Sequence, residues 1–295
     1  MEPLPYHERI ALYQNHITPF QLRLRAGKQK LYIPQLVGLR RSITNGHFHL
    51  TPELFLQRTG VTEFTCPADR FDLGEGEMAV ISRGVPHAET ARQSPKHPFR
   101  GLVFTFEPNS FSLLKSHAGT DGRPWVIFAD RFMVPQSGQL ARYLDDLGEW
   151  GNGNPMVAQG LLLAFCAIIL ETLKTAAEGK PTTAQDVSPR VQQCREIIKA
   201  YLSDPTLSVH RLAKNLRCTP DYLTRCFRLE TGESLNAHIR NERLAYSQTL
   251  LQNPELNISE IAWATGFHSP NYFIRAFREY SGQTPKSYRR RLARA

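Results

Sequence analysis

The chain has 295 residues, which is enough for about two domains at ~150 residues each. Hydrophobic residues make up 41% and charged residues 21%, a globular composition that excludes disordered and fibrous proteins. The longest apolar run, Gly160 to Leu170, is shorter than the ~20 residues that cross a bilayer. The first residues lack the pattern of a signal peptide, and the five cysteines form no CxxC pair. We therefore expect a cytoplasmic protein without a membrane segment, a disulfide framework or a zinc finger.

The positive charge is concentrated in the last third of the chain. Residues 188–295 hold 17 Lys and Arg against 9 Asp and Glu, whereas residues 1–187 hold 19 against 18. A local excess of positive charge is expected where a protein binds a polyanion such as DNA. A basic region also keeps a protein soluble, so charge alone supports nucleic-acid binding only weakly.

The first 136 residues have the pattern of a β domain. Short β-rich stretches separated by Gly, Pro and Asp run from Tyr32 to about Phe106, and this spacing predicts a β-sandwich or barrel. From Ser137 onward the pattern becomes helical. We therefore expect an α+β multidomain protein, with a barrel over residues 1–136 that is followed by helices of its own.

Two helices are predicted within residues 137–177. Gln139 to Trp150 is amphipathic, and Pro155 to Ala177 is apolar almost all round. One face of the second helix can cover the barrel. Its other face is either buried within the same subunit or paired with the same helix of a second subunit. The polar stretch 178–189 is typical of a linker, and residues 190–295 are predicted to form an all-helical domain.

The last third contains an internal repeat. PDYLTRCFRLETGES begins at Pro220 and PNYFIRAFREYSGQT begins at Pro270, with Pro, Tyr, Arg, Phe, Arg and Gly in register. The segments before them match too, as LSVHRLA from Leu207 and LNISEIA from Leu256. One supersecondary unit is therefore present twice, over about 208–230 and 257–280.

Each copy carries the signals of a helix, a turn and a second helix. Residues of N-cap type precede all four helices: Ser208, Thr219, Asn257 and Ser269. Pro220 and Pro270 suit the first turn of the second helix in each copy. Gly266 suits a left-handed turn residue, and Arg217, at the corresponding place in the first copy, costs some strain.

The second helix of each copy has an apolar face and a polar face. Leu223 and Phe227, like Phe273 and Phe277, lie four residues apart and are predicted to point inward. The opposite faces carry Asp221, Thr224, Arg225 and Arg228 in one copy, and Asn271, Ile274, Arg275 and Arg278 in the other. Arginine can pair with guanine and asparagine with adenine. The pattern predicts two helix-turn-helix units, and the repeated outward arginine disfavours a plain hairpin with solvated arginines.

Residues from about Val191 to Arg290 resemble the DNA-binding domain of the AraC/XylS family of bacterial transcription regulators. The matching segments are LSVHRLAKNLRCTPDYLTRCFRLETG, RLAYSQTLL and ISEIAWATGFHSPNYFIRAFREYSGQTPKSYRR. The resemblance implies that Pro220 to Leu229 and Pro270 to Glu279 are recognition helices, joined by a rigid helix over Leu235 to Gln252. They would enter successive major grooves ~34 Å apart. The implied partners are promoter DNA, RNA polymerase and a second copy of the chain, in a bacterial, nucleoid-associated location.

The same resemblance assigns roles to single residues of the repeat. It implies base contacts from Asp221, Thr224, Arg225, Asn271 and Arg275, phosphate contacts from Arg228 and Arg278, and a DNA contact from Ser269. Asp221 repels phosphate but can accept a hydrogen bond from cytosine, and Ile274 can touch only a thymine methyl group. The operator sequence therefore stays open.

A second motif lies in the N-terminal half. Residues from about Gly46 to His87 resemble the two motifs of the cupin barrel, although Ser82 stands where proline is usual and no asparagine follows His87. Alternation places His47 and His49 on one face, and Glu53, Phe55 and Gln57 follow if the strand restarts in phase. Three histidines and a glutamate are ligand types that suit iron, manganese or zinc.

Three interpretations of this pocket stay open. In a sensor, His47, His49, Glu53, Phe55, Gln57 and His87 would bind a small effector without a required metal, with Phe48 and Trp125 as further walls. In a metalloenzyme, His47, His49, Glu53 and His87 would hold a divalent ion. In an inert barrel that serves only for dimerisation, they are structural residues. We expect the sensor, and no enzyme, because a pocket fused to a DNA-binding domain is usually an input.

The sequence thus predicts a sequence-specific transcription regulator whose cupin-like domain senses a small molecule. Effector binding would shift the population toward one placement of the DNA-binding domain and so control promoter binding or activation.

Overall fold

The computed structural model describes residues 4–34, 46–49, 51–107, 109–119, 122–135, 137–151, 153–178, 188–254 and 256–292. The chain divides into two compact units, residues 1–184 and 185–295. Most of the predicted linker, residues 179–187, lies outside the described residues.

Unit 1 begins with a helix that the sequence analysis does not predict. Helix α1 (Tyr6–Arg25) buries Ile10, Tyr13, Ile17 and Phe20, which recur every three or four residues on one face. Tyr6–Arg25 is therefore helical and does not form part of a barrel wall.

Two sheets follow α1. The larger has the order β1-β5-β2-β7-β8-β9 and the smaller the order β4-β3-β6. All pairings are antiparallel except that of β1 with β5. The strands are β1 (Leu31–Tyr32), β2 (Glu53–Thr59), β3 (Val61–Thr65), β4 (Arg70–Leu73), β5 (Met78–Ile81), β6 (Ala88–Arg92), β7 (Arg100–Glu107), β8 (Ser110–Ala118) and β9 (Pro124–Met133). The β region thus extends beyond Phe106, where the predicted strands end.

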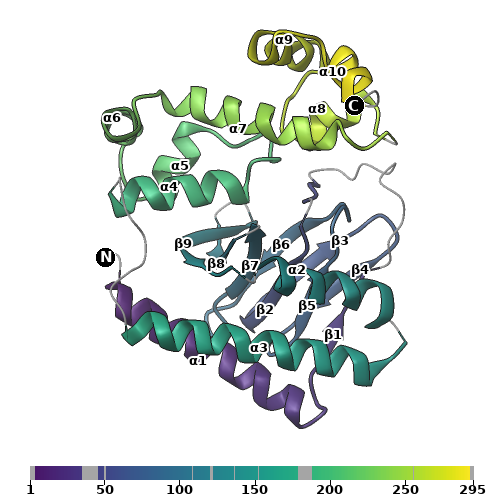
Figure 1. Ribbon diagram of the computed structural model, residues 1–295. Helices are drawn as coiled ribbons and strands as arrows, with labels where there is room; N and C mark the ends of the chain where they lie inside the picture. Colours follow the sequence, from purple (N-terminus) through teal and green to yellow (C-terminus); the bar gives the residue numbers. More distant parts are fainter. Residues whose placement is uncertain are drawn as a thin grey trace. The chain divides into compact units, whose positions relative to one another are not determined.

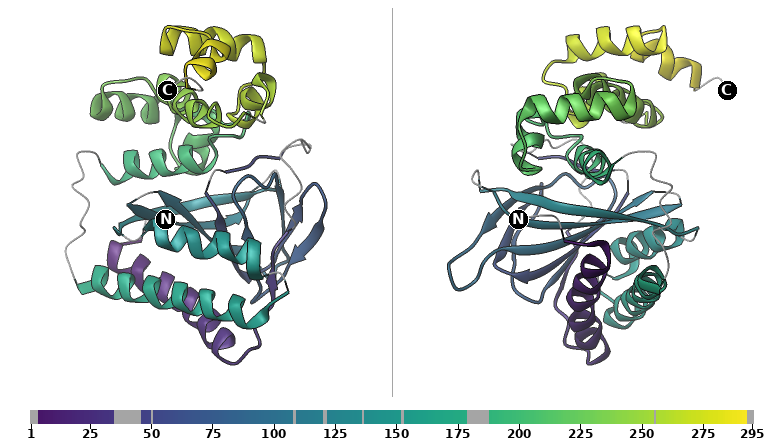
Figure 2. Two further views of the ribbon diagram at one scale, coloured as in Figure 1. Left: turned by 45° about the vertical axis from the view of Figure 1, so that its right-hand side comes forward. Right: turned by 90° about the vertical axis from the view of Figure 1, so that its left-hand side faces the viewer.

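Helices α1, α2 (Ser137–Asp146) and α3 (Pro155–Glu178) lie on one side of the larger sheet (Figures 1 and 2), and a π-helical turn over Leu147–Gly151 follows α2. Side-chain alternation along β2 explains the two cores of this unit. Leu54 and Leu56 join the core under the helices, whereas Phe55 joins Phe64 and other residues in a second core between the sheets.

Helix α3 is long and apolar. By length and composition it could cross a membrane, but Leu162, Phe165 and Ile169 are buried in the core of unit 1. The helix is longer than the apolar run counted in the sequence, because it also includes the residues before Gly160 and after Leu170. The buried side of α3 packs against α1 and the larger sheet.

Unit 2 is entirely helical in its described residues. Its helices are α4 (Pro189–Ala200), α5 (Val209–Asn215), α6 (Pro220–Thr231), α7 (Leu235–Leu250), α8 (Ile258–Ala264), α9 (Pro270–Ser281) and α10 (Pro285–Leu292). Arg289, Arg290 and Arg291 form a basic last turn of α10. Helix α7 ends two residues before the predicted end at Gln252.

Candidate functional site

The predicted caps of the repeated unit are present. The Ser208 side chain accepts a hydrogen bond from the Arg211 amide at the start of α5. At the start of α8, the Asn257 side chain accepts from the Glu260 amide, while the Glu260 carboxylate accepts from the Asn257 amide. These bonds satisfy amides that a helix N-terminus leaves without intrahelical partners, and so they fix where each first helix begins.

The turns between the helices have the predicted left-handed residue. Gly266 has φ +78° between α8 and α9, and Arg217 has φ +52° between α5 and α6. Within the described part of the chain, Arg217 is the one residue other than glycine with positive φ. Both copies therefore build the same turn, although only one has the residue that suits it.

Helices α6 and α9 present the predicted faces. Leu223, Phe227, Phe273 and Phe277 are fully buried. The predicted DNA-contact residues lie on the opposite side: Asp221, Arg225, Arg228, Asn271, Arg275 and Arg278 are exposed, and Thr224, Ser269 and Ile274 are half-buried. Within unit 2, the arginine-bearing faces of α6 and α9 are therefore exposed and can bind a partner molecule.

Aromatic rings hold some of the exposed groups in place. The guanidinium of Arg275 lies 5.5 Å from the ring centre of Tyr272, one turn earlier on α9. In the first copy, the Tyr222 ring instead has Arg190 of α4 over it at 5.2 Å, and Arg190 donates to the Tyr222 hydroxyl. Arg275 is thus supported by its own helix through a cation–π contact.

Ser269 has a structural task besides the predicted DNA contact. Its hydroxyl accepts a hydrogen bond from the Tyr272 amide and so caps α9, as Thr219 does for α6. The hydroxyl proton remains available as a donor.

In Figure 1, α6 lies near one end of α7 and the α8–α9 pair near the other. Helix α7 therefore holds the two helix-turn-helix units apart.

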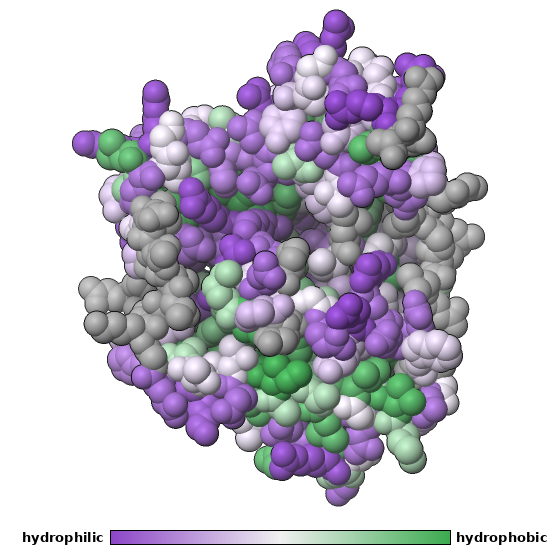
Figure 3. Space-filling view, in the orientation of Figure 1, coloured by the Kyte–Doolittle hydropathy of each residue, from purple (hydrophilic) through white to green (hydrophobic). Residues whose placement is uncertain are grey.

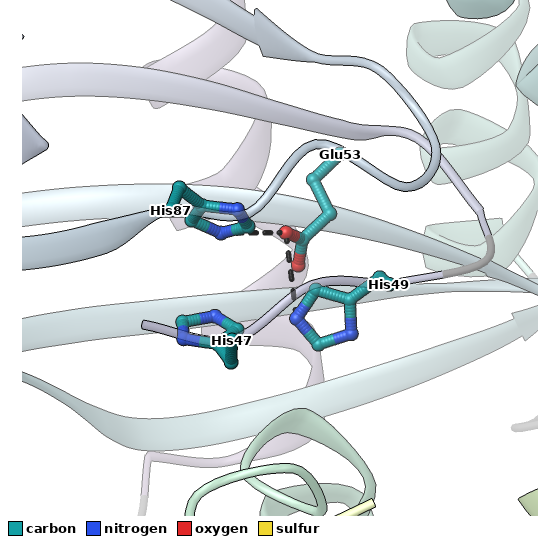
Figure 4. Close-up of side chains that lie close together, drawn as sticks. All are labelled: His47, His49, Glu53 and His87. Atoms are coloured by element: carbon teal, nitrogen blue, oxygen red, sulfur yellow. Dashed lines mark ion pairs between the residues drawn. The ribbon is translucent and has the colours of Figure 1, made fainter. Parts of the chain in front are cut away.

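Four of the predicted pocket residues of unit 1 come together. The ligand atoms of His47, His49, Glu53 and His87 all lie within 4.8 Å of one another, and their side chains point toward a common centre (Figure 4). The Glu53 carboxylate lies 3.3 Å from Nε2 of His87 and 3.6 Å from Nε2 of His49.

Two segments that are far apart in the sequence assemble this cluster. Among the described residues, His47 and His49 lie outside the named strands. An isolated antiparallel bridge pairs His47 with His87, with N–O distances of 2.9 and 2.8 Å, and β2 begins only at Glu53. The cluster therefore depends on a pairing between residues far apart in the sequence and not on alternation along one strand.

Burial and mutual charge set the ionisation of the cluster. Burial lowers the pKa of His47 well below its usual value, and the neighbouring His87 and His49 lower it further. Burial also lowers the pKa of His49. For His87, burial acts in the same direction, but the Glu53 carboxylate, with Glu89 and the Val85 carbonyl, outweighs it and raises the pKa. The pKa of Glu53 is lowered, because His49 and His87 outweigh the opposing effect of burial.

The donor set fits a divalent metal ion. Among the described residues, Nε2 of His49, Nε2 of His87 and Oε2 of Glu53 are buried atoms that make no hydrogen bond of good geometry. Unsatisfied buried polar atoms are costly and rare in native proteins. Neutral imidazole nitrogens and a carboxylate oxygen that converge on one point are the donors that iron, manganese and zinc prefer. An ion there would satisfy all three atoms.

The other predicted pocket residues are not ligands of this cluster. Phe55 packs edge-to-face on Phe64 at 5.0 Å, and Gln57 is held by Thr62, whose hydroxyl donates to it at 2.7 Å. A cavity of about 10 Å³ beside Gln57 has room for about one water molecule. Phe48, which lies between His47 and His49 in the sequence, is buried. Trp125 lies on β9 opposite His117 and is partly exposed.

Glu89 also belongs to this region, although the motifs in the sequence do not include it. Glu89 lies two residues after His87, and its carboxylate is 3.6 Å from Nε2 of His87. Burial raises the pKa of Glu89 to about 7. Alternation from His87 into β6 places both side chains on one face, so the spacing contains the signal that finds Glu89.

Comparison with known proteins concerns mainly the last third of the chain. A family described as "Helix-turn-helix domain" matches residues 212–291. The Msm operon regulatory protein of Streptococcus mutans is 35% identical over 141 residues, which are 47% of this chain and 49% of that protein. The transcriptional activator RhaR of Salmonella arizonae is 38% identical over 154 residues, 51% of this chain and 54% of RhaR.

The chain spans about half the length of the curated relatives that it matches. Among solved structures, the C-terminal domain of AraT, a response regulator from Geobacillus stearothermophilus, is 33% identical with a TM-score of 0.35. That match covers 36% of this chain and 87% of the AraT domain.

Proposed function

Because residues 212–291 form a helix-turn-helix domain of the AraC/XylS type, we propose that the whole chain is a sequence-specific transcription regulator. The observation that carries this proposal is the repeated, outward-facing arginine on two capped helices, at Arg225 and Arg275. Such helices read base edges in the major groove of duplex DNA.

The geometry of unit 2 supports the use of both helices on one DNA molecule. Helix α7 has 16 residues and so is about 24 Å long. A spacer of this size separates α6 and α9 on the scale of one helical turn of DNA, ~34 Å. The predicted base contacts stay Asp221, Thr224, Arg225, Asn271 and Arg275, with Ser269 as a further contact. Arg228 and Arg278 are proposed to bind phosphate, which steers the domain onto DNA without reading sequence.

The experiment is selection of genomic fragments bound by the full chain, followed by binding measurements on the selected site and on random DNA. Arg225→Ala and Arg275→Ala should each lose about 1–3 kcal/mol on the selected site and much less on random DNA. Arg228→Ala is the matched comparison, since loss of a phosphate contact weakens binding to both DNAs alike. An equal loss on both DNAs for Arg225→Ala would reassign that arginine to phosphate.

We propose that unit 1 is a cupin-like effector sensor over residues 1–136, with residues 137–177 as a helical segment. The support is the cluster of His47, His49, Glu53 and His87, buried in a β domain that shares a chain with a DNA-binding domain. The nearby cavity holds about one water, so a larger effector requires side chains such as Phe55 to move. A broad panel of metabolites tests the proposal, because an effector stabilises the folded chain against heat. If no member of the panel shifts the melting temperature, a dimerisation role without an effector is favoured.

Helix α3 is the proposed contact between two copies of the chain. Its outward side carries exposed Met156 and Val157 and the small residues Gly160, Ala164 and Ala167. Figure 3 shows apolar side chains gathered over this part of unit 1. Ala164→Glu should shift the sedimenting species from dimer to monomer, because a charge at the centre of an apolar contact is costly. A monomeric parent chain would contradict this contact.

A second candidate function of the cluster is divalent metal binding, which the unsatisfied nitrogen and oxygen atoms of His49, His87 and Glu53 favour. His47, His49, Glu53 and His87 would hold the ion, which would supply a Lewis acid for binding an effector or, in an enzyme, for catalysis. Elemental analysis of the purified chain should find a stoichiometric metal that His49→Ala loses. Gln57→Ala is the matched control, since Gln57 is held by Thr62 outside the cluster. Metal-free protein that gains no metal on addition of iron, manganese or zinc would remove this function.

A further inference from the structure

A cluster of basic side chains lies between α1 and the larger sheet, on the opposite face of β2 from Glu53 and Phe55. Its members come from four elements: His16 and Arg23 from α1, Arg58 from β2, Arg100 from β7 and Lys115 from β8. In the sheet, β2 pairs with β7 and β7 with β8, so these strands bring the last three residues to one region. The charges of His16 and Lys115, His16 and Arg58, and Arg23 and Arg58 all repel one another.

Two members of the cluster are buried, although each can carry a positive charge. His16 and Lys115 are each only 7% exposed. Burial and, to a smaller extent, the neighbouring cations lower the pKa of His16 to about 4 and that of Lys115 to about 8. A buried lysine that no carboxylate neutralises, beside a histidine that burial keeps neutral, destabilises a fold, so the arrangement needs an explanation.

The acids of this region do not neutralise the cluster. Asp130 on β9 is already bound by Arg9 and Tyr13, at 2.8 Å from each. Glu75 attracts Arg23. Within the described residues, no carboxylate forms an ion pair with Arg58, Arg100 or Lys115.

The cluster also has buried nitrogen atoms without partners. Nε2 of His16 and one terminal nitrogen of Arg23 are buried and make no hydrogen bond within the described residues. The other ring nitrogen of His16 lies 3.2 Å from the Leu12 carbonyl, which can only accept, so Nε2 becomes a donor when a bound anion favours protonation of His16. Nε of Arg23 donates to Gln29. The Arg23 guanidinium rests on the Phe20 ring at 4.6 Å, which holds it near Arg58.

We propose that this cluster binds a small oxyanion, a phosphate or carboxylate group, at a site separate from the His47–His87 region. Arg58 and Arg100 lie partly or fully in solvent and form the entrance, while His16 and Lys115 form the floor. Guanidinium groups bind phosphate and carboxylate oxygens in pairs, and an anion supplies the counter-charge and acceptors that the cluster lacks. Since α1 and three central strands contribute, a bound anion would tie α1 to the sheet.

The test uses the full chain, with inorganic phosphate as the probe and chloride at equal ionic strength as the reference. Phosphate should raise the melting temperature above the chloride value, because a ligand of the folded state stabilises it. Lys115→Met should raise the melting temperature in chloride, since one repelling charge is gone, and weaken phosphate binding about tenfold. Arg100→Gln, at an exposed position that folding tolerates, should weaken it similarly. Lys174→Met, an exposed lysine on α3, is the matched control and should leave the response to phosphate unchanged.

The outcomes separate the sources of the anion. Glycerol phosphate and citrate, tested alongside phosphate, show whether a phosphate ester or a carboxylate binds more tightly. An equal response to phosphate in the parent chain and in Lys115→Met, or no response in the parent chain, overturns the proposal. Protection by duplex DNA but by none of the small anions overturns it too. Binding of the selected promoter fragment should be unchanged in Lys115→Met, so failure of this site is distinguishable from failure of the proposed regulator function.

Discussion

The turn between α8 and α9 is the most sharply constrained backbone position of the second helix-turn-helix unit. Gly266 has φ +78°, and a Cβ built there would lie 2.6 Å from the Leu202 carbonyl oxygen and 2.8 Å from two atoms of the Arg243 guanidinium. Arg243 cannot easily retreat, because it donates to the Leu202 and Asp204 carbonyls at 3.0 and 2.8 Å. Gly266→Ala therefore faces both a left-handed backbone penalty and a clash with backbone.

The two contributions can be estimated separately. A left-handed residue other than glycine costs about 1–2 kcal/mol. Overpacking against atoms that cannot move adds about 1–3 kcal/mol. We expect Gly266→Ala to lower the stability of the α8–α9 region by about 2–5 kcal/mol in all, and to weaken DNA binding because α9 shifts.

Gly232→Ala is the matched control. Gly232 has the same φ, +78°, at the end of α6, but nothing lies within 4 Å of its added Cβ. Only the left-handed penalty applies there, about 1–2 kcal/mol. Hydrogen exchange of the amides in α8 and α9, compared with those in α6, measures each loss where it occurs. Equal losses in the two variants would refute the steric part of the reasoning.

Three further changes have outcomes that follow from the structure. Asn257→Ala removes the capping box with Glu260 and should lower the free energy of unfolding by about 1 kcal/mol, measured as a lower urea midpoint of unit 2. An unchanged midpoint would show that the cap does not stabilise the unit. Arg217→Gly relieves a left-handed backbone strain of about 1–2 kcal/mol but adds a conformational-entropy cost of about 0.5–1 kcal/mol. We therefore expect a small rise in the urea midpoint of unit 2, and a fall would contradict this reasoning. Burial, together with Lys115, lowers the pKa of His16 in the folded chain to about 4, against about 6.5 in the unfolded chain. Between these two pH values unfolding takes up a proton, so the free energy of unfolding falls as the pH is lowered. His16→Gln should flatten the dependence of thermal stability on pH in that window, and a slope as steep as that of the parent chain would assign it to other groups.

Local signals in the sequence were enough to predict the helices and turns of the DNA-binding unit. The caps at Ser208 and Asn257, the left-handed residues at Arg217 and Gly266, and the division of α6 and α9 into buried and exposed faces all depend on residues within a few positions of one another. Helix capping, glycine turns and a period of 3.6 residues are local physics, so a repeated sequence predicts a repeated structure. The sequence also identified His47, His49, Glu53 and His87 as a set by their chemistry.

Only the tertiary structure decided how distant segments meet. The bridge between His47 and His87 joins residues 40 positions apart, and neither segment contains a signal for the pairing. The burial of Lys115 beside His16 likewise depends on the packing of α1 against β8. The helix excludes water from the lysine, and the sequence around Lys115 contains no signal for this contact. Strand pairing and helix docking are set by the summed burial of apolar surface over the whole unit, which no single stretch of sequence contains.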